Sequence, residues 1–176
     1  MKNQSITEAM LQFIEESPTA FHAAANVEAL LLENGFEKLE NLAEGALVPG
    51  GSYYTMQNGS AVLAVKIPEN PAKGFRIAAS HSDSPCFKIK EVPEMKVENT
   101  YVKLNVEKYG GMILSPWLDR PLSFAGRVFV AGKDGKPEAK LVNLKKDLLI
   151  IPNVAIHFNR EINNGFAYNP QTDMAP

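Results

Sequence analysis

The hydrophobic pattern of this chain changes once, from a helical spacing to an extended one, and this change constrains the fold more than any other feature. Before Pro49–Gly51, apolar residues recur three and four positions apart, which is the spacing of one face of a helix. After it, they fall in short segments that glycine and proline separate, which is typical of strands. The sequence therefore predicts an α/β fold whose helices come first.

Local signals place two helices in the N-terminal part. Ser5–Glu8 has the S-x-x-E form of a capping box and predicts a short helix that ends at about Glu16. Ser17 is expected to be the N-cap of a second helix, with Pro18 at its first position. Gly35 is expected to end this second helix, because glycine adopts positive φ without strain.

A hairpin and a buried strand are predicted next. Asn58–Gly59 is the strongest short hairpin signal, because both central residues of a type I′ turn need positive φ. Strands are expected on either side of it, over 52–57 and 61–67. The apolar run 75–80 is expected to be a buried central strand that carries His81 at its carboxyl end.

A second region, mainly β, is predicted to start near Val92. No long helical pattern follows that residue, whereas extended segments recur between glycine-containing breaks. The predicted segments are 100–109, 123–131, 140–144 and 148–150.

The composition excludes several classes of protein. The 176 residues are 45% hydrophobic and carry a net charge of −2 without a basic block, so no nucleic-acid or anionic-lipid partner is expected. No run approaches the roughly 18 apolar residues of a membrane span. Cys86 is the single cysteine and the first residues do not resemble a signal peptide, so we expect a cytoplasmic protein.

The segment Ser80–Pro85 holds the residues best suited to chemistry. Residues two apart on an extended segment point to the same side, so Asp83 can accept a hydrogen bond from one ring nitrogen of His81 and leave the other for a metal. The alternative is a polar turn that ends a strand. A hydrolytic triad with Ser82 or Ser84 is less favoured, because the sequence neighbours Ser82 and His81 project to opposite faces.

Three further residues have side chains capable of chemistry. Cys86 could be a nucleophile, but a small buried structural residue is its favoured role. His22 lies in the second predicted helix, where a satisfied or exposed histidine is the default. His157 lies in the segment 151–158, and periodicity does not distinguish a ligand from a structural residue there.

Several motifs stand in the order and spacing of one known family. They are Ser17–Ala23, Ala79–Cys86, Tyr109–Gly111, Trp117–Arg120, Ala125–Val128 and Ile151–His157. Over essentially its whole length the chain resembles the aspartyl aminopeptidase and aminopeptidase I family of dinuclear zinc exopeptidases. Ser82 stands where this family usually has threonine, and Pro121 where an acidic residue is frequent.

The resemblance implies roles for three residues. His81 is similar to the family's first metal ligand, and Asp83 to the carboxylate that orients it and supports catalysis. His157 is similar to a substrate-contacting histidine that reaches into the active site of a neighbouring subunit. The implied architecture is part of a three-layer zinc-exopeptidase-type catalytic domain over 1–91, followed by part of an inserted, mainly β dimerisation domain over 92–176.

The resemblance also implies an activity. Such a protein is a metal-dependent aminopeptidase that removes N-terminal residues, acidic ones among them, from peptide substrates. A complete site would hold two Zn²⁺ ions, for which Mn²⁺ or Co²⁺ can substitute, and the family forms homodimers that assemble into larger homo-oligomers. Family members are much longer and 169–176 shows no capping or strand pattern, so we expect an N-terminal portion that is inactive alone.

Two other classes of function stay open. One is a non-catalytic, β-rich oligomerisation or binding module, and the other is a mononuclear metal-binding protein that uses His81, Asp83 and His157. Selectivity for acidic residues would need a placed cation. The candidate cations are Arg120, Arg127 and Arg160.

Overall fold

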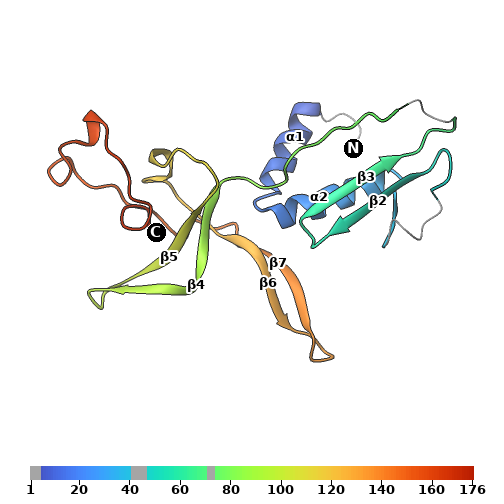
Figure 1. Cartoon of the computed structure of the whole chain (residues 1–176). Helices are drawn as coiled ribbons and strands as arrows, with labels where there is room; N and C mark the ends of the chain where they lie inside the picture. Colours follow the sequence, from blue (N-terminus) through green and yellow to red (C-terminus); the bar gives the residue numbers. More distant parts are fainter. Residues whose placement is uncertain (1–4, 41–46, 71–73) are drawn as a thin grey trace. The chain divides into compact units, whose positions relative to one another are not determined.

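The computed structural model describes residues 5–40, 47–70 and 74–176. Contacts divide the chain into two units (Figure 1). The N-terminal unit contains the residues up to Asp83 together with 125–143, and the C-terminal unit contains 84–124 together with 144–176. The polypeptide therefore passes between the units three times, after residues 83, 124 and 143.

The helices of the N-terminal unit follow the local signals of the sequence. α1 (Ile6–Glu15) begins with the predicted capping box, in which Glu8 N–H donates to Ser5 Oγ and Ser5 N–H donates to the Glu8 carboxylate. α2 (Ala20–Glu33) ends just before Gly35, whose φ is +76°. Among the described residues, no helix has the length and apolar character needed to cross a bilayer.

The N-cap of α2 is Thr19, which corrects the prediction of Ser17. Thr19 has an extended backbone, and its Oγ1 accepts a hydrogen bond from His22 N–H at 3.4 Å. The Ser17 hydroxyl instead accepts a hydrogen bond of 3.0 Å from the side chain of Asn26. The cap is the residue whose side chain reaches the free N–H groups of the first turn, and that residue is Thr19.

A small sheet follows the helices. β1 (Glu37–Lys38) pairs in parallel with β2 (Ser52–Gln57), and β2 pairs antiparallel with β3 (Ala61–Lys66). The turn between β2 and β3 has φ of +54° at Asn58 and +67° at Gly59. The predicted hairpin is therefore confirmed, and both central residues of its turn have the positive φ for which the Asn-Gly pair was expected.

Side chains of α2 and β2 form the core of the N-terminal unit. Ala23, Ala24 and Tyr54 are buried there. The Tyr54 hydroxyl donates to Glu28 Oε1 at 3.0 Å, and Lys38 Nζ lies 2.9 Å from the same oxygen. The hydrogen bond from Lys38 is the main cause that holds the pKa of Glu28 below its usual value. This group ties α2 to β1 and β2.

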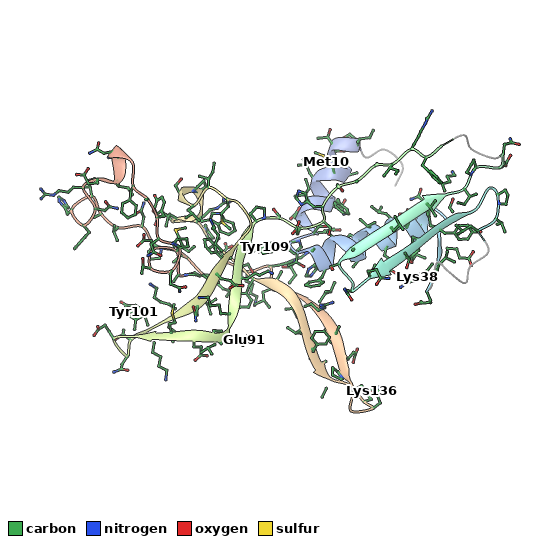
Figure 2. All side chains as sticks on the ribbon, in the orientation of Figure 1. Met10, Lys38, Glu91, Tyr101, Tyr109 and Lys136 are labelled. Carbon is green, nitrogen blue, oxygen red and sulfur yellow. The ribbon has the colours of Figure 1, made fainter. Side chains whose placement is uncertain are left out.

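A hairpin from later in the sequence belongs to the same unit. β6 (Ala125–Ala131) pairs antiparallel with β7 (Pro137–Asn143), and β6 contacts α2. Lys136 marks the turn of this hairpin (Figure 2). The domain division after residue 91 concerns the complete protein and stays a prediction.

The C-terminal unit begins with a long hairpin. β4 (Cys86–Val97) pairs antiparallel with β5 (Tyr101–Tyr109), and the register shifts between Ile89 and Glu94. Extended structure therefore starts at Cys86, ahead of the predicted start near Val92.

The rest of the C-terminal unit is held by isolated bridges. Leu118 bridges Ile151, and Leu122 bridges Leu149, so the predicted strand at 148–150 is present only as such bridges. Leu104 N–H donates to the carbonyl oxygen of Pro176 at 2.7 Å, which places the last residues beside β5. The short 3-10 helices of this unit are η1 (Ser115–Trp117) and η2 (Ile162–Asn164). Its buried apolar residues are Val106, Ile151, Met174 and Ala175.

The predicted buried strand at 75–80 is wrong for this structure. These residues form no strand, and Phe75 and Ile77 are 91% and 86% exposed. A central strand needs a hydrogen-bonded neighbour on each side, and none of the described strands pairs with this segment. Its apolar side chains are therefore exposed within this chain.

Candidate metal site

The His81–Asp83 pair has the hydrogen bond that its spacing predicts. His81 Nδ1 lies 2.9 Å from Asp83 Oδ1 and 2.8 Å from the Asp83 carbonyl oxygen. A backbone carbonyl can only accept, so Nδ1 carries the proton and the neutral ring keeps its lone pair on Nε2. The His81 side chain is 80% exposed. The exposed ring therefore has an unprotonated Nε2, which is the form of an imidazole nitrogen that can bind a metal.

Ser82, between them, is engaged elsewhere. Its Oγ donates to the carbonyl oxygen of Ser60, in the turn between β2 and β3, at 2.9 Å. The hydroxyl proton is therefore directed at Ser60 and not at His81. This geometry argues against the alternative in which His81 activates Ser82 as a nucleophile.

His157 lies in the C-terminal unit, on an exposed turn. The turn is closed by the hydrogen bond from Phe158 N–H to the Ala155 carbonyl, at 2.8 Å. The segment before it is fixed by Asp119, whose N–H donates to the Ile151 carbonyl at 2.9 Å. Its role toward a neighbouring subunit stays a prediction.

Asp119 makes a second contact with this segment. Its Oδ1 accepts a hydrogen bond from Asn153 N–H at 2.8 Å. The backbone of Asp119 has φ of +56°, a conformation that costs little for Asp and more for most other residues. Asp119, in the motif Trp117–Arg120, thus holds the segment that leads to His157 through two hydrogen bonds, which we call the Asp119 clamp.

The donor set fits one metal ligand and not a complete site. A carboxylate that fixes the tautomer of a histidine is the usual support of a zinc-binding imidazole. A catalytic zinc site uses three protein ligands. Within 5–40, 47–70 and 74–176, no group of three or more His, Cys, Asp or Glu side chains is arranged to hold a metal. His157 belongs to the other unit, so the mononuclear alternative with His81, Asp83 and His157 stays a prediction.

The other two candidates, His22 and Cys86, lie in α2 and β4. Nδ1 of His22 lies 2.8 Å from Thr19 Oγ1, and partial burial lowers the pKa of His22. It is a satisfied histidine at the start of α2, as expected. Cys86 is half-buried at the first position of β4, opposite Tyr109.

Sequence reasoning missed the surroundings of the turn 58–60. Arg127 of β6 donates from Nη1 to the Asn58 carbonyl oxygen at 2.6 Å. Its guanidinium lies 4.0 Å above the ring of Phe21 and 5.3 Å from that of Phe129. The contact with Asn58 spans 69 positions in the chain, so no local pattern could reveal it.

The C-terminal unit contains an open cavity of about 260 Å³. It lies among β5, the bridged segment at Leu118 and the last residues of the chain, and its polar lining includes Lys103, Asn153 and Asp173. His81 and Asp83 do not line this cavity.

Comparison with known proteins gives consistent matches. A family model described as aminopeptidase I zinc metalloprotease (M18) matches residues 13–176. The chain is 47% identical over 180 residues to a probable M18 family aminopeptidase 2 of Clostridium acetobutylicum, which covers 100% of this chain and 42% of that protein. The chain thus spans about two fifths of that relative's length.

Solved structures agree. A chain in the cryo-EM structure of the Ape4 and Nbr1 complex matches with a TM-score of 0.88 and 36% identity, over 96% of this chain and 33% of that one. A chain of the S. cerevisiae mApe1 dodecamer matches with a TM-score of 0.77 and 28% identity, over 87% and 36%. The predicted resemblance and the predicted fold class, part of a larger α/β fold, are confirmed.

Proposed function

Because the chain belongs to the aminopeptidase I zinc metalloprotease (M18) family, we propose that the protein it comes from is a zinc-dependent aminopeptidase. The observation that supports the proposal is the His81–Asp83 pair, in which the carboxylate and carbonyl oxygens of Asp83 fix the proton on Nδ1. Peptides with a free N-terminus are the proposed substrates.

His81 would hold a zinc ion through Nε2. Bound zinc polarises the scissile carbonyl and lowers the pKa of a bound water to about 7. Asp83 would keep the His81 ring in the tautomer whose Nε2 can bind metal. The proposed contribution of this chain is therefore one oriented ligand and its carboxylate partner.

The remaining ligands and the general base would lie outside these residues. We propose that the complete site holds two zinc ions, replaceable by Mn²⁺ or Co²⁺, and that the chain alone is inactive. The share of a relative that the chain covers, 42%, supports this part of the proposal. The chain would then contain part of a catalytic domain, over 1–91, and part of a dimerisation domain, over 92–176.

The complete protein is proposed to act as a homo-oligomer. A solved relative is a dodecamer, and the exposed turn at His157 gives that side chain access to a second copy. In this proposal His157 contacts substrate in the site of a neighbouring subunit.

A preference for acidic N-terminal residues would need a free cation at the site. Arg127 contacts Phe21 and Asn58, so it is the least favoured of the candidate arginines for binding an acidic substrate residue. Arg120 donates at 3.5 Å to the Pro116 carbonyl, a long hydrogen bond that substrate could displace.

The activity is tested on the protein expressed from its complete reading frame, with aspartyl, glutamyl and leucyl anilides as substrates. His81→Ala is expected to remove stoichiometric zinc and to lower kcat/KM by more than about 100-fold. Loss of a residue that only hydrogen-bonds to a metal ligand already lowers metal affinity or activity by about 10–100-fold. His22→Ala is the matched control, because His22 is a structural histidine bonded to Thr19.

Two results would contradict the proposal. Unchanged zinc content and activity in His81→Ala would remove His81 from the site. Robust turnover by the 176-residue chain alone would show that it is not a partial enzyme. A complete protein with neither zinc nor turnover would favour the non-catalytic binding module.

A further inference from the structure

The turn 58–60 is bound from two sides within the N-terminal unit. Ser82, the residue between His81 and Asp83, donates its hydroxyl to the Ser60 carbonyl at 2.9 Å. Arg127 donates to the Asn58 carbonyl at 2.6 Å. The same turn therefore connects the His81 segment to the hairpin β6–β7.

The conformation of the turn makes these carbonyl oxygens available. The positive φ values at Asn58 and Gly59 turn the backbone tightly, and the loop is closed by the hydrogen bond from Ser60 N–H to the Gln57 carbonyl, at 3.1 Å. The carbonyls of Asn58 and Ser60 lie outside the β2–β3 ladder, which pairs Gln57 with Ala61. They can therefore accept from side chains.

Arg127 suits this position better than lysine would. Its planar guanidinium stacks on Phe21 of α2 at 4.0 Å while Nη1 donates to Asn58. A lysine ammonium cannot stack and donate in this planar manner. Arg127 thus holds α2, β6 and the turn in one arrangement.

The His81 segment depends on such support. Among the described residues, no strand pairs with the preceding residues, 75–80. Within this chain, the segment that carries His81 is therefore held by side-chain contacts and not by a strand ladder. The Ser82 hydroxyl supplies one such contact, to the β2–β3 hairpin.

We propose that Ser82 and Arg127 are positioning residues of the metal site. Arg127 fixes the turn 58–60, the Ser60 carbonyl of that turn holds Ser82, and Ser82 fixes the backbone from which His81 and Asp83 project. The inference rests on the proposed function in taking His81 as a metal ligand. It predicts that a hydroxyl donor is required at residue 82, which threonine also supplies.

The first experiment compares Ser82→Thr with Ser82→Val in the complete protein. Threonine and valine have the same shape, so only the hydroxyl differs. Thr100→Val is the matched control, because Thr100 Oγ1 donates to the Glu98 carbonyl at 3.0 Å in the turn of the other hairpin, β4–β5. Urea unfolding of each variant separates a local change at the site from a general loss of stability.

The zinc dissociation constant is measured by competition with a chelator. Ser82→Val is expected to raise the zinc dissociation constant about 10-fold. This is the lower end of the effect of residues that hydrogen-bond to a metal ligand, because Ser82 acts through the backbone. Ser82→Thr and Thr100→Val are expected to stay within about twofold of the unmodified protein. kcat is expected to fall in Ser82→Val, with a smaller change in KM.

The second readout needs no metal and no activity. NMR shifts of the ring nitrogens in the metal-free protein at alkaline pH report which nitrogen of His81 carries the proton. The unmodified protein and Ser82→Thr are expected to show the proton on Nδ1, and Ser82→Val a mixture with Nε2. This arm tests the positioning of the ring even if His81 proves not to bind zinc.

A third variant tests the link through the turn. Arg127→Lys is expected to shift the zinc affinity and the tautomer in the same direction as Ser82→Val. Since both act on the turn 58–60, the double variant is expected to be no worse than the stronger single variant.

The proposal is overturned if Ser82→Val matches Ser82→Thr in both zinc affinity and tautomer, or if Arg127→Lys and Ser82→Val add fully. Failure of this proposal can be distinguished from failure of the proposed function. If His81→Ala binds zinc as the unmodified protein does, His81 is not a ligand. The comparison of the His81 tautomer in Ser82→Val and Ser82→Thr then tests the positioning role by itself.

Discussion

Replacement of Ile151 by alanine is expected to destabilise the C-terminal unit strongly. Ile151 is 0% exposed and forms a parallel bridge with Leu118. Few side chains share this core, and the substitution removes its largest aliphatic member at the point where the segments around Leu118 and Asn153 meet.

The magnitude follows from the burial. Truncation of a buried isoleucine to alanine costs about 2–5 kcal/mol, because the transfer free energy of the lost methyl groups is joined by the cost of a cavity. The open cavity nearby lets the surroundings relax, so we expect the lower half of the range, about 2–3 kcal/mol. Ile151→Val is expected to cost about 0.5–1.5 kcal/mol.

Fluorescence of Trp117 is the assay. It is the single tryptophan of the chain, it adjoins Leu118, and its ring packs edge-on against Phe87 at 5.1 Å between centroids. Urea unfolding followed at this residue therefore reports the C-terminal unit. The midpoint is expected to fall by about 1–2 M for Ile151→Ala, given slopes of about 1–3 kcal/mol per M.

Ile113→Ala is the control, because Ile113 belongs to the same unit and is 76% exposed. Its free energy of unfolding is expected to change by less than about 0.5 kcal/mol. If the midpoints of Ile151→Ala and Ile113→Ala coincide, burial of Ile151 is not what holds this unit together.

Three further predictions follow from contacts described above. Asp119→Ala removes the acceptor of Asn153 N–H and is expected to speed amide exchange there by about 5-fold, equivalent to about 1 kcal/mol; unchanged exchange would exclude the clamp. Lys38→Met removes the main cause of the lowered pKa of Glu28, and the stabilisation from this cause is present above the ordinary pKa of 4.5 and is lost as pH falls through the lower folded-state pKa. The difference in urea midpoint from the unmodified protein should therefore be present at neutral pH and shrink in acid, and a difference that stays constant with pH would contradict it. Ser5→Ala breaks the capping box and is expected to fray the first turn of α1, seen as faster amide exchange at Glu8, whereas Ser5→Asp should preserve the cap.

The features that the sequence predicted correctly are set by neighbouring residues. The capping box at Ser5, the Asn58–Gly59 turn and the His81–Asp83 hydrogen bond each depend on groups at most three positions apart. Such contacts form whenever the local backbone has the expected conformation, so a pattern is sufficient to find them.

The features that it missed depend on distant partners. The segment 75–80 is apolar enough for a buried strand, but a strand also needs neighbours, and its own residues do not specify them. The sequence indicates Arg127 only as a candidate cation for substrate, because no residue near it in the chain indicates its contacts with Phe21 and Asn58. Thr19 replaced Ser17 as the cap because the hydroxyl of Ser17 has an alternative partner in Asn26.

The return of β6–β7 to the N-terminal unit has a consequence for synthesis on the ribosome. Asn58 is made 69 residues before Arg127, a delay of roughly 3–14 s at 5–20 residues per second. During that interval the turn and the ring of Phe21 have emerged without the guanidinium that joins them. The segment that carries His81 is thus synthesised well before the residue that holds its turn, and a nascent chain released before β6 would lack the Arg127 contacts with Asn58 and Phe21.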